Sequence, residues 1–238
     1  MLSWREECDL LAARRHGETD AIVDLFAPSR GRWVAVVKGG AGRRLRPSLQ
    51  PGARLSVEWR ARLEEHVGTA RVEPLRGRAG ALMSDADALS ALSAAAALLV
   101  AALPEREPHP ALHARTAALF DALGREGWPA AYARWELSLL AELGYALDLS
   151  VCAATGATGR LVWVSPKSGR AVSAEAGAPY AERLLPLPPF LTGAAPPGRE
   201  DVAAALRLTG FFLTAALRES GREGLPPARL RLAERLGA

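Results

Sequence analysis

The pattern of hydrophobic residues changes near residue 80, and this change constrains the fold more than any other feature of the sequence. Before that point, short β-branched runs are separated by Gly and Pro, at residues 21–27, 32–39 and 54–65. In the last run, Leu55, Val57 and Trp59 alternate with polar side chains, which is the period of a half-buried strand. About four or five such strands in so short a segment favour a small closed barrel over an open sheet.

After residue 80 the spacing of the apolar residues is helical. We expect one strand at Leu161–Val164 and helices over residues 80–105, 109–127, 128–149, 200–220 and 226–236. Residues 184–201 are rich in Pro and small side chains, which predicts a loop or linker. The sequence therefore predicts an α+β fold with a β-barrel domain at 1–79 and a mainly helical domain at 80–238. Within the helical domain we expect an irregular insertion at about 150–178.

The positive charge is concentrated in the predicted barrel segment. Residues 1–79 contain 15 Arg and Lys against 10 Asp and Glu, whereas residues 80–238 contain 15 against 16. The excess behind the formal net charge of +4 therefore lies in the first third of the chain. No acidic residue occurs between Asp24 and Glu58. Such an asymmetry indicates a surface that binds a polyanion.

Six side chains in this acid-free segment are candidate nucleic-acid-binding residues: Arg30, Arg32, Lys38, Arg43, Arg44 and Arg46. The strand faces and loops of an OB-like barrel form a cationic groove along a nucleic-acid backbone, and guanidinium groups suit phosphate oxygens. The alternative is a solvated loop whose charge serves only solubility. Trp33 could belong to the core or stack on a base. Trp59 lies on the same face of its strand as Leu55 and Val57, which places it in the core.

No sequence motif of a familiar catalytic or nucleotide-binding site is present. The glycine-rich "KGGAGRR" at 38–44 lacks the lysine position and the following helix of a P-loop, and neither GxSxG nor HExxH occurs. His109 and His113 are four residues apart with Pro110 between them. We expect both to face solvent at the start of a helix rather than to bind a metal. The sequence therefore predicts a protein that is not an enzyme.

Three further features indicate the cellular compartment. Cys8 and Cys152 are the only cysteines, which fits a reducing environment. The longest apolar run, at 89–104, is shorter than the ~20 residues of a membrane span. Charged residues occupy the N-terminal positions where a signal peptide has its apolar region. We expect a cytoplasmic protein without a membrane partner.

Several short elements appear in one order along the chain: "GETDAIVDLF", "GRW", "VVKG", the pair Arg43–Arg44 and "LQPG". Further on come "LLAELGYALDLSVCAATG" and "VSPKSGRAVS", and then the C-terminal helix. This succession resembles the family of the DNA repair and recombination protein RecO, over nearly the whole chain. The second group is similar to the family's helix that leads into a zinc-ribbon region.

The resemblance implies an N-terminal OB-fold followed by a helical domain, and a role in recombination. Members would bind single- and double-stranded DNA, anneal complementary strands, and help to load the RecA recombinase onto DNA covered by single-strand-binding protein (SSB). The implied partners are RecR and the acidic C-terminal tail of SSB, with RecA acting indirectly. Arg134, beside Trp135 on a helix, is a candidate for the rim of a pocket that binds this tail.

The chain departs from the family at the zinc site. Many members carry CxxC…CxxC, but here Cys152 is followed at the other three positions by Thr155, Ser173 and Ala176. A structural Zn²⁺ needs four N, S or O ligands, which this set does not supply. We therefore predict a ribbon-like insertion without zinc, held by packing of the strand at Leu161–Val164, and no cofactor.

Two alternatives to a recombination mediator remain open. In the first, the protein is an interaction scaffold whose barrel binds an acidic protein partner, and nucleic-acid binding is incidental. In the second, the same barrel binds RNA. Affinities for DNA and for an SSB-tail peptide, measured over a range of salt concentrations, distinguish the scaffold from a DNA-binding mediator. A preference for RNA over DNA of matched sequence would identify the RNA-binding alternative.

Overall fold

The structure is a computed structural model that describes residues 2–63 and 65–238. Contacts within the chain divide it into two compact units, Met1–Gly124 and Arg125–Ala238, and each is described by itself. The first unit contains the β strands of the N-terminal segment and also the first two long helices. The domain boundary expected at 79/80 marks the change from strands to helices, and it stays a prediction.

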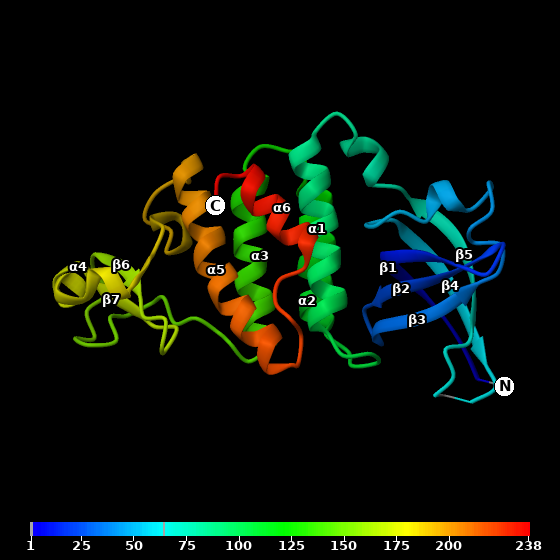
Figure 1. The fold of residues 1–238 in the computed structure, drawn as a ribbon, viewed down its shortest axis with the longest axis horizontal. Helices are drawn as coiled ribbons and strands as arrows, with labels where there is room; N and C mark the ends of the chain where they lie inside the picture. The colour runs from blue at the N-terminus through cyan, green and yellow to red at the C-terminus, as the bar shows by residue number, and fades with distance from the viewer. Residues whose placement is uncertain (1, 64) are drawn as a thin grey trace. The chain divides into compact units, whose positions relative to one another are not determined.

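The first unit is built on a closed barrel of five strands, in the order β1-β2-β3-β5-β4 (Figure 1). The strands are β1 (Leu2–His16), β2 (Asp20–Ala27), β3 (Gly31–Val37), β4 (Arg54–Ala61) and β5 (Thr69–Arg76). Neighbouring strands are antiparallel except for a short parallel pairing of β3 with β5. The predicted small closed barrel is confirmed, and its strand order is OB-like.

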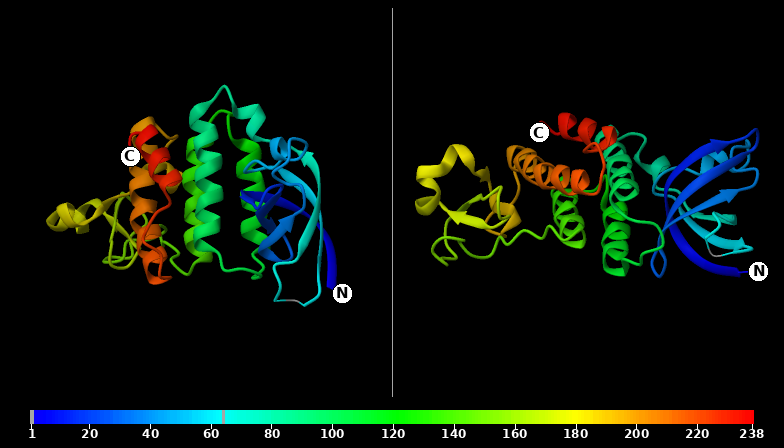
Figure 2. Two further views of the ribbon diagram at one scale, coloured as in Figure 1. Left: turned by 45° about the vertical axis from the view of Figure 1, so that its right-hand side comes forward. Right: turned by 60° about the horizontal axis from the view of Figure 1, so that its bottom comes forward.

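The long strand β1 closes the barrel because it pairs with two partners. Its first half runs antiparallel to β4, from Leu2 opposite Ala61 to Asp9 opposite Arg54. Its second half pairs with β2. The register shifts between Leu10 and Ala12, and a bulge of this kind bends a strand and increases its twist. The strands accordingly curve around a common interior in both views of Figure 2.

The barrel interior is filled by the alternating apolar residues of the strands, including three tryptophans. Trp4 stacks on Trp59 with ring centroids 5.9 Å apart, and Trp33 meets both rings edge-on. Trp33 and Trp59 are both buried, so the core position predicted for Trp59 is confirmed. The open question about Trp33 is answered in the same way, since its ring belongs to the core.

Helices α1 (Ala86–Ala102) and α2 (Pro110–Ala122) complete the first unit, after a short 3-10 helix at Ala79–Leu82. Asp85 caps α1 by accepting hydrogen bonds from the backbone N–H groups of Asp87 and Ala88. Helix α1 packs closely on the barrel, because a Cβ atom added at Gly52 would lie 2.5 Å from Cδ1 of Leu92.

The expected exposure of two histidines is wrong. His109 precedes α2 and His113 lies in its first turns, as the sequence predicts, but both side chains are buried. The ring of His113 packs edge-on against Phe26 of β2, with centroids 5.1 Å apart. This face of α2 is turned to the barrel instead of to solvent.

The second unit combines helices with a small sheet. Its helices are α3 (Trp128–Glu142), α4 (Ala174–Gly177), α5 (Arg199–Glu219) and α6 (Pro227–Arg235). The sheet has the order β7-β6-β8, with β6 (Leu161–Val164), β7 (Ala171–Ser173) and β8 (Leu185–Pro186). The predicted strand at Leu161–Val164 is confirmed, and 3-10 helices at Ala178–Arg183 and Pro189–Leu191 follow it in the chain.

A buried ion pair joins the helices of this unit. Arg229 of α6 donates to both carboxylate oxygens of Glu136 on α3, at 2.9 Å for the Nη2–Oε2 pair. The hydroxyl of Thr209 on α5 donates to the same carboxylate. Across the described residues of both units, no helix has the length and apolar character needed to cross a membrane.

Candidate nucleic-acid interface

The connection between β3 and β4, residues 38–53, carries most of the predicted binding residues. It is tied to the barrel at both ends by backbone hydrogen bonds. At its start, Ala41 N donates to Thr19 O at 2.9 Å, and at its end Gly52 N donates to Leu10 O at 2.7 Å. A 3-10 helix at Arg46–Ser48 lies between these anchors. The connection is therefore a fixed part of the barrel surface.

Three arginines of this connection are available to a ligand. Arg43, Arg44 and Arg46 are exposed, and none has a side-chain hydrogen bond or ion pair within residues 2–63 and 65–238. Lys38 is also exposed, at 72% of its side chain, but its Nζ lies 2.8 Å from Oδ2 of Asp20. That hydrogen bond, together with one from the N–H of Gly39, lowers the pKa of Asp20. Lys38 thus carries a partly neutralised charge, unlike the three arginines.

The two remaining candidates, Arg30 and Arg32, are placed differently. Arg32 is buried, and its guanidinium lies 2.7 Å from Asp24 Oδ1 and 3.2 Å from Glu105 Oε1. Its Nε also donates to a backbone carbonyl at the end of α1. Arg30 is half-buried, with its guanidinium 5.2 Å from the ring centroid of Trp4. The position of Arg32 argues for a structural role, since its donors are satisfied inside the unit.

A groove of about 500 Å³ runs between the end of β1 and the β3–β4 connection. From β1 it is lined by Arg14 and Arg15, and from the connection by Arg46, among other residues. Arg15 is held by hydrogen bonds to the carbonyls of residues 17 and 18, whereas Arg14 is exposed and has no such partner within the described chain. We call this the basic groove.

The sequence reasoning missed Arg14 and Arg15, although a signal for them existed. The pair lies at the end of β1, just before His16 and the turn to β2, and in OB-type barrels this turn contributes to nucleic-acid binding. Together with the arginines of the connection, Arg14 gives four guanidinium groups that have no acidic partner within residues 2–63 and 65–238. Such groups attract phosphates and release counterions when they neutralise them.

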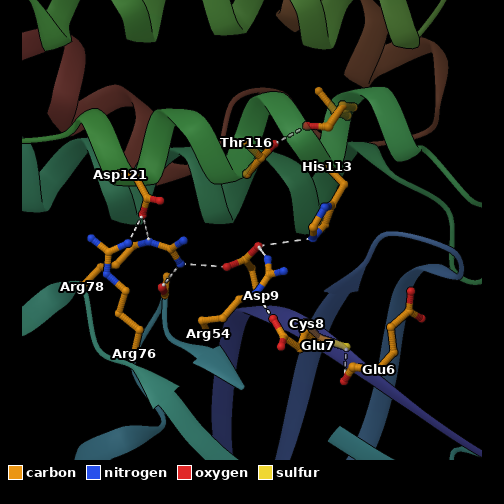
Figure 3. A network of polar contacts seen from close by, with 12 residues as sticks. Glu6, Glu7, Cys8, Asp9, Arg54, Arg76, Arg78, His113, Thr116 and Asp121 are labelled. Carbon is orange, nitrogen blue, oxygen red and sulfur yellow. Dashed lines mark hydrogen bonds and ion pairs between the residues drawn. The ribbon is translucent and has the colours of Figure 1, made fainter. Parts of the chain in front are cut away.

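A buried network of charges fixes the far end of the connection (Figure 3). The side chain of Asp9 on β1 is fully buried and lies 2.7 Å from Arg78 Nη1, 2.9 Å from Arg54 Nη1 and 3.2 Å from His113 Nε2. Arg78 Nη1 also donates to the carbonyl of Gly52 at 2.8 Å. The network therefore holds together β1, α2 and the backbone that follows the basic groove.

The electrostatics of Asp9 follow from these contacts. Burial disfavours its charged form, but the close contact with His113, the hydrogen bond from Arg78 and the charges of Arg78 and Arg54 outweigh that effect and lower its pKa. The carboxylate thus stays ionised inside the unit. Sequence reasoning did not identify this network, because the partners of Asp9 are far from it in the chain.

Comparison with known proteins places the chain in a family. One family model, described as "Recombination protein O N terminal", matches residues 1–78, and a second, "Recombination protein O C terminal", matches residues 83–223. The chain belongs to the RecO family. It is 52% identical to the DNA repair protein RecO of Roseobacter denitrificans, over 98% of both chains. It is likewise 52% identical to that of Phenylobacterium zucineum, over 99% of this chain and 98% of the relative.

The resemblance to RecO inferred from the sequence is thereby confirmed. The chain is a DNA repair and recombination protein, and RecO proteins are non-enzymatic recombination mediators. The prediction that this chain is not an enzyme is confirmed by its membership.

The residues at the family's zinc positions do not fit a zinc ion. Cys152 is buried, and its sulfur accepts a hydrogen bond from the backbone N–H of Ser173 at 3.3 Å. The Ser173 hydroxyl lies 3.5 Å from that sulfur and caps α4 by accepting from Ala176 N. Hydrogen bonds from Ser173 and Thr155 lower the pKa of the Cys152 thiol to about 6. The set offers one thiol and two hydroxyls, which are not the thiolate and imidazole ligands of structural zinc.

Proposed function

We propose that this RecO-family chain is a recombination mediator whose OB-fold barrel binds single- and double-stranded DNA through its basic surface. It would anneal complementary strands and assist the loading of RecA on DNA covered by SSB. The observation that carries this proposal is a set of exposed arginines that have no side-chain partner within the described residues. Arg14 and Arg46 line the basic groove, and Arg43 and Arg44 lie in the β3–β4 connection. Lys38 and Arg30 stay candidates, although Lys38 pairs with Asp20 and Arg30 lies 3.8 Å from Glu6 Oε2, while Arg32 serves the fold.

Charge neutralisation supplies the mechanism for annealing. Two DNA strands repel each other through their phosphates, and arginines that neutralise phosphates on both reduce this repulsion. Guanidinium groups also bind phosphate oxygens through paired hydrogen bonds, which holds the strands in place. Because phosphate contacts carry no sequence information, we expect little sequence preference.

The partners of the proposed function are RecR and the acidic tail of SSB, and RecA is an indirect partner. The chain itself would act without a metal cofactor. For the tail, Arg134 stays a candidate. It is exposed on α3, its guanidinium lies 5.1 Å from the ring centroid of Phe190, and its Nη2 donates to the carbonyl of Phe190 at 3.1 Å. The ring of Phe190 is itself buried, so the exposed guanidinium of Arg134 is what this position offers to an acidic peptide. Work on chromosomal DNA implies a cytoplasmic location.

The test is a salt titration of DNA binding by the variant Arg43→Glu/Arg44→Glu/Arg46→Glu. These side chains have no internal partner within the described residues, so the changes leave no buried charge behind. We expect a large loss of affinity and a fall of about two in the salt slope for single strands, since each lost phosphate contact is worth ~0.7. The matched control is Arg115→Glu/Arg218→Glu/Arg222→Glu, which changes the net charge equally at exposed helix positions and at the turn after α5.

The same titration separates the alternatives. If the control and the test variant bind DNA equally well while only the test variant loses an acidic SSB-tail peptide, the scaffold hypothesis replaces DNA binding. If the wild type prefers RNA over DNA of matched sequence, the barrel is an RNA-binding module. We expect neither result, because unpaired arginines around a groove attract both nucleic-acid backbones without a contact that selects the 2′-hydroxyl.

A further inference from the structure

We propose that the basic groove binds the sugar–phosphate backbone of a DNA strand and leaves the bases unbound and free to pair. This inference rests on the proposed DNA-binding function and specifies which part of the ligand the groove recognises. It follows from the chemistry of the groove and from the positions of the aromatic side chains.

The walls of the groove combine charge with small side chains. Arg14, Arg15 and Arg46 supply the charge, and much of the remaining lining is alanine or glycine. The connection lies directly on the barrel here, since a Cβ atom added at Gly40 would lie 2.8 Å from Cβ of Ala21. None of the lining residues is aromatic. Base stacking on a protein needs a planar side chain, which in the groove only guanidinium groups provide.

The aromatic side chains of the barrel strands are committed to the interior. Phe26, Trp33 and Trp59 are buried, and the indole N–H of Trp59 donates to the carbonyl of Val67 at 2.9 Å. Trp4, which is half-buried, stacks on Trp59 and has the guanidinium of Arg30 near its ring. These four are all the Phe, Tyr and Trp residues of β1 to β5, and the exposed imidazole of His16 at the end of β1 does not line the groove. The barrel therefore uses for its core the rings that a base-stacking barrel presents to its ligand.

The polar side chains of the groove also favour the backbone of DNA over its bases. Two of the three arginines, Arg14 and Arg46, keep their guanidinium donors free within the described chain, and a phosphate offers the opposite charge. The amide of Gln50, which could read a base edge, is engaged because its Nε2 donates to the carbonyl of Arg46 at 3.1 Å. Charge complementarity thus selects phosphates.

This mode of binding suits annealing. A strand held by stacking of its bases must give up those contacts before it pairs, whereas a strand held by its phosphates keeps its pairing edges exposed. A second strand can then pair without displacing the protein. Binding to single and double strands with one surface follows from the same geometry, since both present phosphates.

The experiment compares two labelled strands of about 30 nucleotides, longer than the site of one OB-type barrel, by fluorescence anisotropy with the full chain. One strand has mixed sequence, and the other has the same phosphates with an abasic sugar at every position. We expect the two dissociation constants to agree within about twofold, because each stacked base would contribute about fivefold or more. An abasic strand that binds more than about tenfold more weakly would overturn the inference.

The variant Arg14→Ala/Arg46→Ala assigns the contacts to the groove. It should weaken binding of the normal and the abasic strand by the same factor, with Arg115→Ala/Arg218→Ala as the control that leaves both unchanged. A loss confined to the normal strand would mean that these arginines read bases, and the inference would be wrong. If the wild type binds the normal strand but not the abasic one, only this inference fails. If it binds neither, the proposed DNA-binding function fails as well.

Discussion

Replacement of Asp9 by Asn tests the buried network that holds the first unit together. The substitution keeps the shape of the side chain and removes its charge, so Arg78 loses its closest buried partner while its own side chain is only 6% exposed. Removal of one member of a buried ion pair costs about 3–5 kcal/mol. Arg78 keeps Asp121 at 2.6 Å, and Arg54 can shift toward Glu7 at 3.3 Å. We therefore expect the lower end of that range, about 3 kcal/mol.

The effect should also depend on pH in a defined direction. In the folded chain the pKa of Asp9 is lowered from its ordinary value near 3.8. The charge of Asp9 therefore contributes stability that is fully present above the unfolded pKa and is lost as the pH falls through the folded pKa. The difference between the wild type and Asp9→Asn should be constant near neutral pH and shrink in acid below about pH 4.

The assay is amide hydrogen exchange of peptides from β1 and β4 in increasing urea, because exchange reports the stability of the first unit separately from that of the second. Glu7→Gln is the matched control. Glu7 also pairs with Arg54 but is 60% exposed, and an exposed pair contributes at most about 1 kcal/mol. A loss below about 1 kcal/mol for Asp9→Asn, or a loss equal to that of Glu7→Gln, would refute the reasoning.

Three further predictions concern other parts of the molecule. Gly52→Ala should lower the thermal midpoint of unfolding more than Gly39→Ala. Both glycines have positive φ, but only at Gly52 would the new Cβ lie 2.5 Å from a side-chain atom of Leu92. Equal shifts of the two midpoints would contradict this packing. Glu136→Gln should destabilise the second unit by about 3 kcal/mol in urea by leaving Arg229 buried without its charge partner, and a loss within about 0.5 kcal/mol would be the contrary result. The purified protein should contain no stoichiometric zinc by elemental analysis, and one zinc per chain would show that other ligands complete the ribbon.

The parts of the fold predicted from sequence are those with a clean local period. The alternation of Leu55, Val57 and Trp59 predicts β4, and helical spacing predicts α5. The strand β1 was not predicted. It is 15 residues long, pairs with β4 and then with β2, and shifts register between Leu10 and Ala12, so no single alternation runs through it. A strand shared between two partners can be recognised only once the barrel is closed.

The residues of the candidate interface also fall into those whose exposure or burial the sequence predicts and those for which it does not. The exposure of Arg43 and Arg44 follows from a glycine-rich connection, which the sequence shows directly. The burial of Arg32 does not, because Glu105, one of its partners, is 73 residues away in the chain. The burial of His113 depends on Asp9 in the same manner, since only the packing of α2 on the barrel brings the two together. Charged residues that pair across distant segments look, in sequence, like charged residues that face solvent.

The most direct measurement of the central claim is the rate of strand annealing by Arg43→Glu/Arg44→Glu/Arg46→Glu, with folding checked by circular dichroism. If the β3–β4 connection is the DNA surface, the folded variant loses DNA binding and annealing together, by at least about tenfold in rate, while the variant Arg115→Glu/Arg218→Glu/Arg222→Glu anneals like the wild type. If the folded variant anneals at the wild-type rate, these arginines are only solvated charge, and the scaffold hypothesis takes the place of a DNA-binding mediator.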